Sequence, residues 1–426
     1  MIGLLALLAV VSYLPVLWQP FIADDYHNIL LARGLTSTAG WAAHLADPTQ
    51  CFRTGHLLLT GGLDRLFGPM PLLYYGLSLL LHLLNTGLVY LVLGAWREAG
   101  WRVATFAAAF FAVYEGHQEA VMWYSAGIQV LVCLCILVAL AGWIRWLQAD
   151  RPSPWAYALI LAGTAGALLS KESAVSLLPL LMIVAAVNRP PWRRALAGLI
   201  PVALAVSAVV AWLWLGRIGN NRFLDGSFSL LAPWPATLLR SLARMLWFWG
   251  LAAVAVLAVC RPPGWIRRLA LAAAWAVVWL MPFCFLTYMD HVPSRHVYGA
   301  SIGLAWIVGM AFACLADRWG EKHRGWVWAL AAIIVIHNAG YLWTKKRVQF
   351  LERAASTEAL VRLARQAKGP VRIERFPYLP IVASSALEVE LGPAAPPLVF
   401  DLSGEPSRGP LDFRYTALPP MENPSK

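Results

Sequence analysis

The stretch WAYALILAGTAGALLSKESAVSLLPLLMIVAAV, residues 155–187, decides the architecture of the chain. Its only charged residues are Lys171 and Glu172, which interrupt one long apolar run. Apolar runs of about 18 residues or more are typical of membrane helices, and ions at a membrane edge are costly and tend to face a cavity. We therefore interpret the stretch as two membrane spans, 155–170 and 173–188, joined by a charged turn.

Composition extends this interpretation to the whole chain. Of its 426 residues, 60% are hydrophobic and only 13% are charged, which is too little charge for the surface of a soluble protein of this length. Because lipid forces each segment to satisfy its own backbone polar groups, we expect an all-α polytopic membrane protein. About eleven transmembrane helices are predicted, at 1–20, 71–96, 102–115, 122–147, 155–170, 173–188, 195–216, 234–260, 265–288, 297–316 and 326–344.

The charge distribution predicts how these spans are oriented. One set of connections is rich in Arg and Lys, and the positive-inside rule assigns it to the cytoplasm, with the N-terminus inside and the C-terminus outside. We expect the cytoplasmic (inner) membrane of a bacterium. The net charge of +12 is assigned to topology and lipid contact, not to nucleic acid. The basic residues of the connections assigned to the cytoplasm are Arg97, Arg102, Arg145, Arg151, Arg189, Arg193, Arg194, Arg261, Arg267, Arg268, Arg318, Lys322 and Arg324.

The first span is interpreted as uncleaved, because no Lys or Arg precedes Arg33 and no small-residue cleavage site is evident before Asp24. A long extracytoplasmic loop, 21–70, follows it. Amphipathic stretches at 55–67 and 236–247 predict short helices that lie along the membrane surface.

Composition changes after Lys345-Lys346-Arg347, which divides the chain into a membrane domain, 1–346, and a small extracytoplasmic α/β appendage, 347–426. The elements predicted in the appendage are an amphipathic helix at 348–368, a strand at 371–376, further strands near 387–391 and 398–402, and a disordered end at 419–426. The six cysteines form no C-x-x-C pair, so neither a disulfide framework nor a zinc site is indicated.

Five polar clusters fall on the outer side of the predicted bilayer. A chain that is otherwise apolar thus gathers its ionisable groups at one face, which suggests chemistry there. The clusters are Asp24-Asp25, residues 115–119, residues 170–173, the loop 217–225 and residues 290–296.

The acidic pair Asp24-Asp25 has two interpretations. Asp is a favoured N-cap, which would explain one of the two residues. A carboxylate that is partly desolvated beside an apolar wall can instead act as a general base. His27 could join a metal site, but one His with two carboxylates is a weak signal. A divalent metal is therefore possible but not indicated.

The charged residues and histidines of the other clusters also have more than one interpretation. Glu115, His117 and Glu119 could form a solvated loop. Lys171 and Glu172 do not face each other as neighbours on a helix, so they need other partners. Arg295, next to His296, could bind a phosphate through its guanidinium fork or extend to the membrane surface. Two polar residues of the second span, His82 and Asn85, are expected to hydrogen-bond between helices.

The order of these features resembles the GT-C glycosyltransferases that use polyprenyl-phosphate sugars, and most closely the membrane portion of the tetratricopeptide-containing O-mannosyltransferase family. The resemblance covers residues 1 to 345. It rests on Asp-Asp-Tyr at 24–26, the segment 52–85, a stretch at 116–127 similar to H-x-x-E-A-V-x-W-x-S-x-R, a stretch at 168–173 similar to L-x-x-K-E, and a stretch at 294–301 similar to E-R-Y-x-Y-x-P-S.

There are departures from the family pattern. Gly127-Ile128 stands where the family often has Arg, Ser294 replaces its Glu and Ala300 replaces its Pro. The tail is too short for stacked repeats of ~34 residues, which puts a protein acceptor held by such repeats in doubt.

The resemblance implies an inverting transferase that moves mannose or another hexose from a polyprenyl-phosphate donor to an acceptor hydroxyl on the extracytoplasmic face. It also implies that no metal or other cofactor is obligatory. The acceptor stays open between protein, glycan and lipid, and membrane lipids are expected partners. The alternatives are a non-catalytic membrane scaffold and a protein that binds or transports lipid-linked sugar. The predicted roles are Asp24 or Asp25 as the base, Lys171, Arg295, Arg217 and Arg222 on the donor phosphate, and His27, His117, Glu119, Glu172, His296 and Tyr298 as orienting groups.

Overall fold

A computed structural model describes residues 1–151, 153–320, 323–401 and 409–420. Within these ranges, six helical segments are long and apolar enough to cross a membrane. They are α5 (Pro71–Ala95), α8 (Ile128–Gln148) with the turn η4 (Tyr124–Gly127), α11 (Trp192–Leu215) with η6 (Gly216–Gly219), α15 (Trp265–Leu280) with η7 (Met281–Phe283), α17 (Ser301–Trp319), and one long segment made of α18 (Arg324–Tyr341), η9 (Leu342–Lys346) and α19 (Arg347–Gln366).

The other predicted spans coincide with shorter or bent apolar segments. Eleven apolar segments therefore fall where eleven spans were predicted, but within the described ranges only six, or seven with the bent pair, have the length to cross alone. Eleven crossings stay a prediction. The shorter segments are α1 (Ile2–Tyr13) with η1 (Leu14–Trp18), α6 (Trp101–Val113), α9 (Pro154–Leu168), and η5 (Glu172–Ser176) with α10 (Leu177–Asn188).

The predicted span 234–260 is broken. Helix α13 (Trp234–Leu246) and helix α14 (Trp249–Cys260) meet at an angle of 77°. Arg240 and Arg244 belong to α13, and two guanidiniums on one face of a membrane-crossing helix would be costly. The sequence predicted both an amphipathic surface helix at 236–247 and an apolar span at 234–260. The bend accommodates both predictions, because α13 is the amphipathic helix and α14 is the apolar part of the span.

Close approach of backbones holds the bundle together. Helix α9 packs along α8, and a Cβ atom added at Gly163 would lie 2.6 Å from the Ala139 nitrogen of α8. Helix α17 packs along α6 in the same way, because a Cβ atom at Gly309 would lie 2.6 Å from the Val103 carbonyl oxygen. Small residues at such contacts let membrane helices interlock without a hydrophobic driving force between them.

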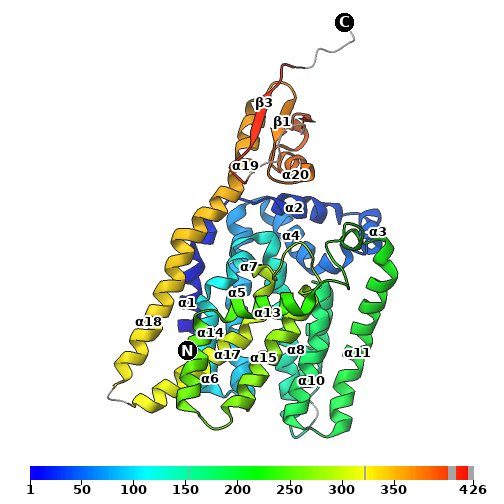
Figure 1. Cartoon of the computed structure of the whole chain (residues 1–426). Helices are drawn as coiled ribbons and strands as arrows, with labels where there is room; N and C mark the ends of the chain where they lie inside the picture. Colours follow the sequence, from blue (N-terminus) through cyan, green and yellow to red (C-terminus); the bar gives the residue numbers. More distant parts are fainter. Residues whose placement is uncertain (152, 321–322, 402–408, 421–426) are drawn as a thin grey trace.

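The two ends of the bundle differ in chemistry (Figure 1). Three surface helices of the long loop, α2 (Asp24–Gly34), α3 (Thr38–Ala46) and α4 (Thr54–Phe67), lie at the end that carries the appendage. The connections α10–α11 and α14–α15 lie at the other end. Arg189 and Arg261 belong to these connections, as the charge pattern predicted. Which end faces the cytoplasm stays a prediction, and Lys322 lies outside the described residues.

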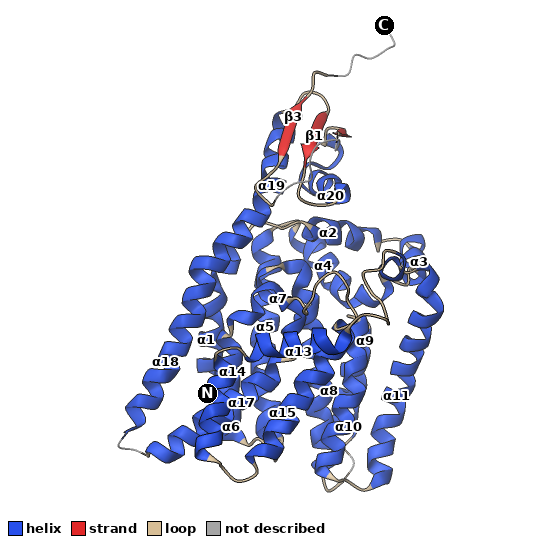
Figure 2. Ribbon diagram, in the orientation of Figure 1, coloured by secondary structure: helices blue, strands red, loops and turns tan. Residues whose placement is uncertain are grey.

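The appendage is a small α/β unit (Figure 2). Its strands β1 (Val371–Arg375), β2 (Leu398–Phe400) and β3 (Arg414–Ala417) form a sheet in the order β2-β1-β3. Strand β1 is parallel to β2 and antiparallel to β3. The helix predicted at 348–368 corresponds to α19. Residues 402 and 421–426, parts of a predicted strand and of the predicted disordered end, lie outside the described residues.

The strand predicted near 387–391 is wrong, because these residues end helix α20 (Pro380–Leu391). Leu387, Val389 and Leu391 alternate with two Glu residues, which imitates a strand period. Upstream, however, Val382, Ala383, Ala386 and Leu387 share one buried face at helical spacing, and Pro380 at the first turn favours a helix start.

Candidate functional site

A cavity of about 810 Å³ opens at the appendage end of the bundle. Its walls come from segments far apart in sequence: α2, the start of α4, the start of α8, the break between α9 and η5, the loop after α11, the loop after α15, and the start of α20. The polar lining residues are Asp24, His27, Asn28, Thr49, Arg53, His56, Ser125, Gln129, Lys171, Glu172, Ser173, Asn220, Arg222, Ser227, Tyr288, Arg295 and His296.

The two neighbouring aspartates have different surroundings. Asp24 is exposed and lines the cavity. Asp25 is fully buried, and four donors reach it: the Ser125 N–H at 2.7 Å, the Ser125 hydroxyl at 2.6 Å, the Ile22 N–H at 2.9 Å and the Tyr75 hydroxyl at 3.1 Å. Burial raises the pKa of Asp25 to about 6, although these hydrogen bonds favour the anion. Of the pair, Asp24 lines the cavity, and Asp25 binds donors that fix the start of α2.

The backbone before the pair is strained. Ala23, the N-cap of α2, has φ +43° and ψ −108°, a combination that L-residues rarely adopt. The Ile22 N–H bond to the Asp25 carboxylate spans this residue and holds it in place. Strain of this kind persists where the surroundings over-determine the conformation, and it is often found at functional sites.

The cavity carries a positive excess. Four cations, Arg53, Lys171, Arg222 and Arg295, and two carboxylates, Asp24 and Glu172, line it among the described residues, so that four minus two leaves a formal charge of +2 with histidines neutral. An anionic ligand fits this imbalance better than a neutral one.

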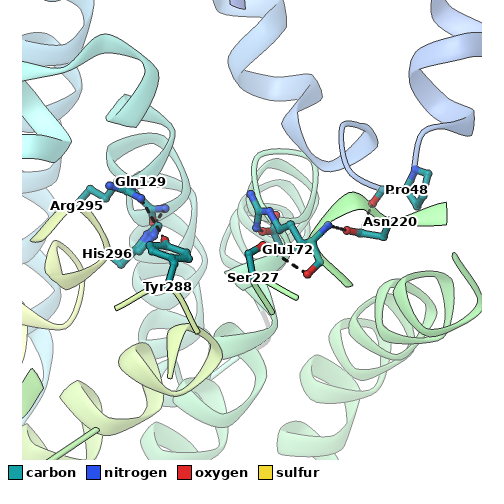
Figure 3. A network of polar contacts seen from close by, with 9 residues as sticks. Pro48, Gln129, Glu172, Asn220, Ser227, Tyr288, Arg295 and His296 are labelled. Carbon is teal, nitrogen blue, oxygen red and sulfur yellow. Dashed lines mark hydrogen bonds and ion pairs between the residues drawn. The ribbon is translucent and has the colours of Figure 1, made fainter. Parts of the chain in front are cut away.

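Two of these cations have carboxylate partners. Glu172 pairs with Arg222, which answers the question of its partner that the sequence left open. Arg295 Nη1 lies 3.6 Å from Glu119 Oε2, and Arg295 Nη2 donates to the Tyr288 hydroxyl at 3.2 Å. Figure 3 shows the groups around Glu172 and around Arg295 as two separate clusters of side chains.

Arg53 and Lys171 are not joined to a carboxylate by any ion pair between described residues. Lys171 is 7% exposed, and burial, opposed by Glu172 and reinforced by Arg222, lowers its pKa to about 7. Burial, and after it the charge of Arg222, also lowers the pKa of Arg53. Lys171 is buried and Arg53 is half-buried, and cations in such positions without a carboxylate partner among the described residues favour an anionic ligand.

A second group of contacts fixes the wall beside Lys171. The His296 ring stacks on Phe283 at 4.2 Å, and its Nδ1 lies 2.8 Å from Gln129 Nε2. The Lys171 ammonium lies 5.8 Å from the centre of the Phe283 ring. Across the cavity, the Asn220 amide donates to the Pro48 carbonyl at 3.2 Å and thereby ties the loop after α11 to the first loop (Figure 3).

The structure separates the predicted site residues into two groups. Asp24, His27, Lys171, Glu172, Arg222, Arg295 and His296 line the cavity. Asp25, Arg217, His117, Glu119 and Tyr298 are not lining residues. Glu119 does not line the cavity itself but forms an ion pair with Arg295, which does. Arg217 lies over the Trp214 ring and donates to the Trp214 carbonyl, so the Arg222 side of this loop supplies the cation.

His117 and Tyr298 belong to the bundle core instead. His117 Nε2 lies 2.6 Å from the Ser301 hydroxyl, and the Tyr298 hydroxyl lies 2.8 Å from His82 Nδ1. The expectation for the second span is confirmed, because His82 also contacts the Ala112 carbonyl and Asn85 donates to the Val130 carbonyl. These contacts join different helices of the core, although Asn85 Oδ1 and His117 Nδ1 are buried without a hydrogen-bond partner.

Arg53, His56 and Gln129 were missed as site residues. Arg53 stands at the start of the predicted surface helix in a loop with few other cations, and Gln129 is polar within a predicted span. These two features of the sequence were visible, but they did not by themselves identify Arg53 or Gln129 as site residues. Within the described part of the chain, no group of three or more His, Cys, Asp and Glu side chains could hold a metal ion. Metal independence stays a prediction.

No protein-family model matches the chain, and no curated protein sequence matches it. Among solved structures, the chain is similar to ArnT from Cupriavidus metallidurans bound to undecaprenyl phosphate, with 18% identity and a TM-score of 0.49 over 92% of this chain and 75% of ArnT. The apo structure of ArnT gives 17% identity and a TM-score of 0.46 over 92% and 74%. At these scores the description of the site rests on the chain's own geometry.

Proposed function

We propose that the chain is a membrane glycosyltransferase of the GT-C type, which transfers a sugar from a polyprenyl-phosphate donor to an acceptor hydroxyl. One observation supports this above all others: a single cavity brings the exposed carboxylate of Asp24 together with two cations, Arg53 and Lys171, that lack carboxylate partners among the described residues. A base for the acceptor and a cradle for the leaving phosphate are the two things that such a transfer needs.

The chemistry follows from these roles. The acceptor oxygen attacks the anomeric carbon while Asp24 takes its proton, and the bond from that carbon to the phosphate oxygen breaks with inversion. The electron pair leaves with the phosphate, so no general acid is required. A positioned base contributes on the order of 10²–10⁴ in rate. Arg53 and Lys171, with Arg222 and Arg295 beside them, offset the charge that develops on the phosphate.

The apolar part of the cavity suits the lipid tail. Val210 and Leu213 of α11 face Phe228 and Leu286, two residues that form an isolated β-bridge. Helix α11 lies at the edge of the bundle, and only 17% of its most apolar stretch is buried (Figure 1). A polyprenyl chain can therefore reach the cations from the membrane beside α11. The family resemblance implies mannose or another hexose, and the acceptor stays open between protein, glycan and lipid.

The cation roles predict how lipid phosphate binds. R53A and K171M are each expected to weaken binding of undecaprenyl phosphate to the purified protein by about tenfold or more, the range for a hydrogen bond to a charged group. R65A is the control, because Arg65 is an exposed arginine of α4 that does not line the cavity. Equal binding by wild type, R53A and K171M in a titration with the labelled lipid would refute the phosphate site.

Lys171 predicts a pH dependence. Its pKa of about 7 means that the ammonium is lost as pH rises from 6 to 9. A phosphodiester donor keeps one negative charge over this range, so its affinity is expected to fall by up to tenfold per pH unit above 7. K171R should flatten this dependence, because arginine stays protonated. Measurement of KM for the donor at several pH values tests this, and an equally steep fall in K171R would contradict it.

A further inference from the structure

The appendage contacts the candidate site at two places. Helix α20 packs against α2, the helix that carries Asp24, and Leu379 and Ile381 at its start line the cavity. Helix α19 makes the second contact, because Arg353 Nη1 lies 3.5 Å from Glu119 Oε1. The appendage therefore meets both the candidate base and the network around Arg295.

Glu119 divides its carboxylate between two arginines. Its Oε1 faces Arg353, while its Oε2 accepts a hydrogen bond from the Arg295 backbone N–H at 3.2 Å and lies 3.6 Å from Arg295 Nη1. The Glu119 side chain is only 14% exposed, so water screens these charges weakly. A carboxylate that serves two guanidiniums offsets less of the charge of each than one that serves a single partner.

Arg353 is fixed within the appendage. Its carbonyl accepts a hydrogen bond of 2.6 Å from the Tyr378 hydroxyl, and its guanidinium lies 5.0 Å from the centre of the Phe350 ring. Arg353 itself does not line the cavity. The ion pairs that connect Arg353 to the cavity lining run through Glu119 to Arg295.

We propose that Arg353 is a positioning residue of the donor site, which takes up part of the charge of Glu119 and so leaves the Arg295 guanidinium available to the donor phosphate. This inference rests on the proposed function. Without Arg353, Glu119 binds Arg295 alone and draws its guanidinium away from the phosphate. Donor affinity falls, and the chemical step changes little, because Arg353 touches neither the acceptor nor Asp24.

Steady-state transfer by the purified full-length protein tests this. R353Q is expected to raise KM for the donor by about two- to fivefold, which is the worth of a partly exposed ion pair, and to leave kcat within about twofold. R353K should keep a KM near that of the wild type. R365Q is the matched control: Arg365 also lies on α19, but its ion pair, with Glu390 at 2.7 Å, stays within the appendage.

A double-mutant cycle separates positioning from support of the fold. In an E119Q background, R353Q should have no further effect, because the carboxylate through which Arg353 acts is gone. E119Q alone should lower KM for the donor. This measurement does not need the R353Q variant, so it tests the inference even if R353Q fails to fold. Three results overturn the inference and leave the proposed function standing. The first is a KM increase by R353Q that persists in the E119Q background, the second is an unchanged KM in R353Q, and the third is a KM increase by E119Q alone. A wild type that neither binds undecaprenyl phosphate nor transfers sugar overturns both.

Discussion

Replacement of Asp24 by Asn is expected to lower the rate of sugar transfer by about 10²–10⁴ and to leave the fold intact. The side chain is exposed at the cavity wall, and no hydrogen bond between described residues depends on its carboxylate. Asn has nearly the same shape but cannot accept the proton of the acceptor hydroxyl. The measurement is transfer from a radiolabelled polyprenyl-phosphate sugar, with thermal unfolding of the same preparation as the check on folding.

Binding of the donor lipid supplies the control for this variant. D24N should bind undecaprenyl phosphate at least as well as the wild type, because removal of one carboxylate raises the positive excess of the cavity. A protein that only binds or transports lipid-linked sugar would use the same cations and would not need Asp24. Full transfer activity in D24N would refute the assignment of the base, while binding without transfer by the wild type would favour the alternative function.

The two aspartates show where sequence reasoning ends. Their adjacency at a span end predicted that one could be a base and one a cap, but nothing in Asp-Asp-Tyr says which. The answer depends on Ser125 and Tyr75, residues about 100 and 50 positions away whose donors converge on Asp25. Their approach depends on helix packing, which local sequence does not contain.

The positions of the apolar segments were predictable because they depend only on local runs of apolar residues, while the number of crossings and their orientation stay predictions. The break at Lys171-Glu172 indicated a turn, and this turn does line the cavity. Arg217 and Arg222 were not distinguishable from the sequence, because only four residues lie between them in one predicted loop. In the structure, Arg222 is the one that pairs with Glu172. Arg53 lay in a long loop whose folding back onto the bundle no local pattern predicts.

The appendage shows the same limit in another form. A period of two in 387–391 favoured a strand, yet the burial of Ala383 and Ala386 makes the segment helical, since α20 packs on both α2 and α19. Tertiary contact overrides a short local pattern when the two disagree. The link from Arg353 to Arg295 through Glu119 joins segments that are far apart in sequence, and no spacing rule predicts it.

Replacement of Asp25 by Asn is expected to act on stability first. Each carboxylate oxygen of Asp25 accepts one backbone N–H and one hydroxyl: Ser125 supplies both donors to Oδ1, and Ile22 and Tyr75 supply those to Oδ2. In either orientation, the Asn amide nitrogen would face a backbone N–H that cannot turn away. A buried donor left without an acceptor costs about 1–3 kcal/mol. D25N should therefore unfold at a lower temperature than the wild type, followed through the fluorescence of the 22 tryptophans.

S125A provides a graded control for this loss. It removes the Ser125 hydroxyl and keeps the backbone N–H, so its cost should be about 1 kcal/mol, smaller than that of D25N. D25N should also lose transfer activity, because the Ile22 to Asp25 hydrogen bond holds the strained Ala23 that aims Asp24 at the cavity. The two variants then differ in thermal stability: D24N unfolds at the same temperature as the wild type, and D25N unfolds at a lower one. A D25N protein with wild-type stability and no activity would reverse the assignment and make Asp25 the base.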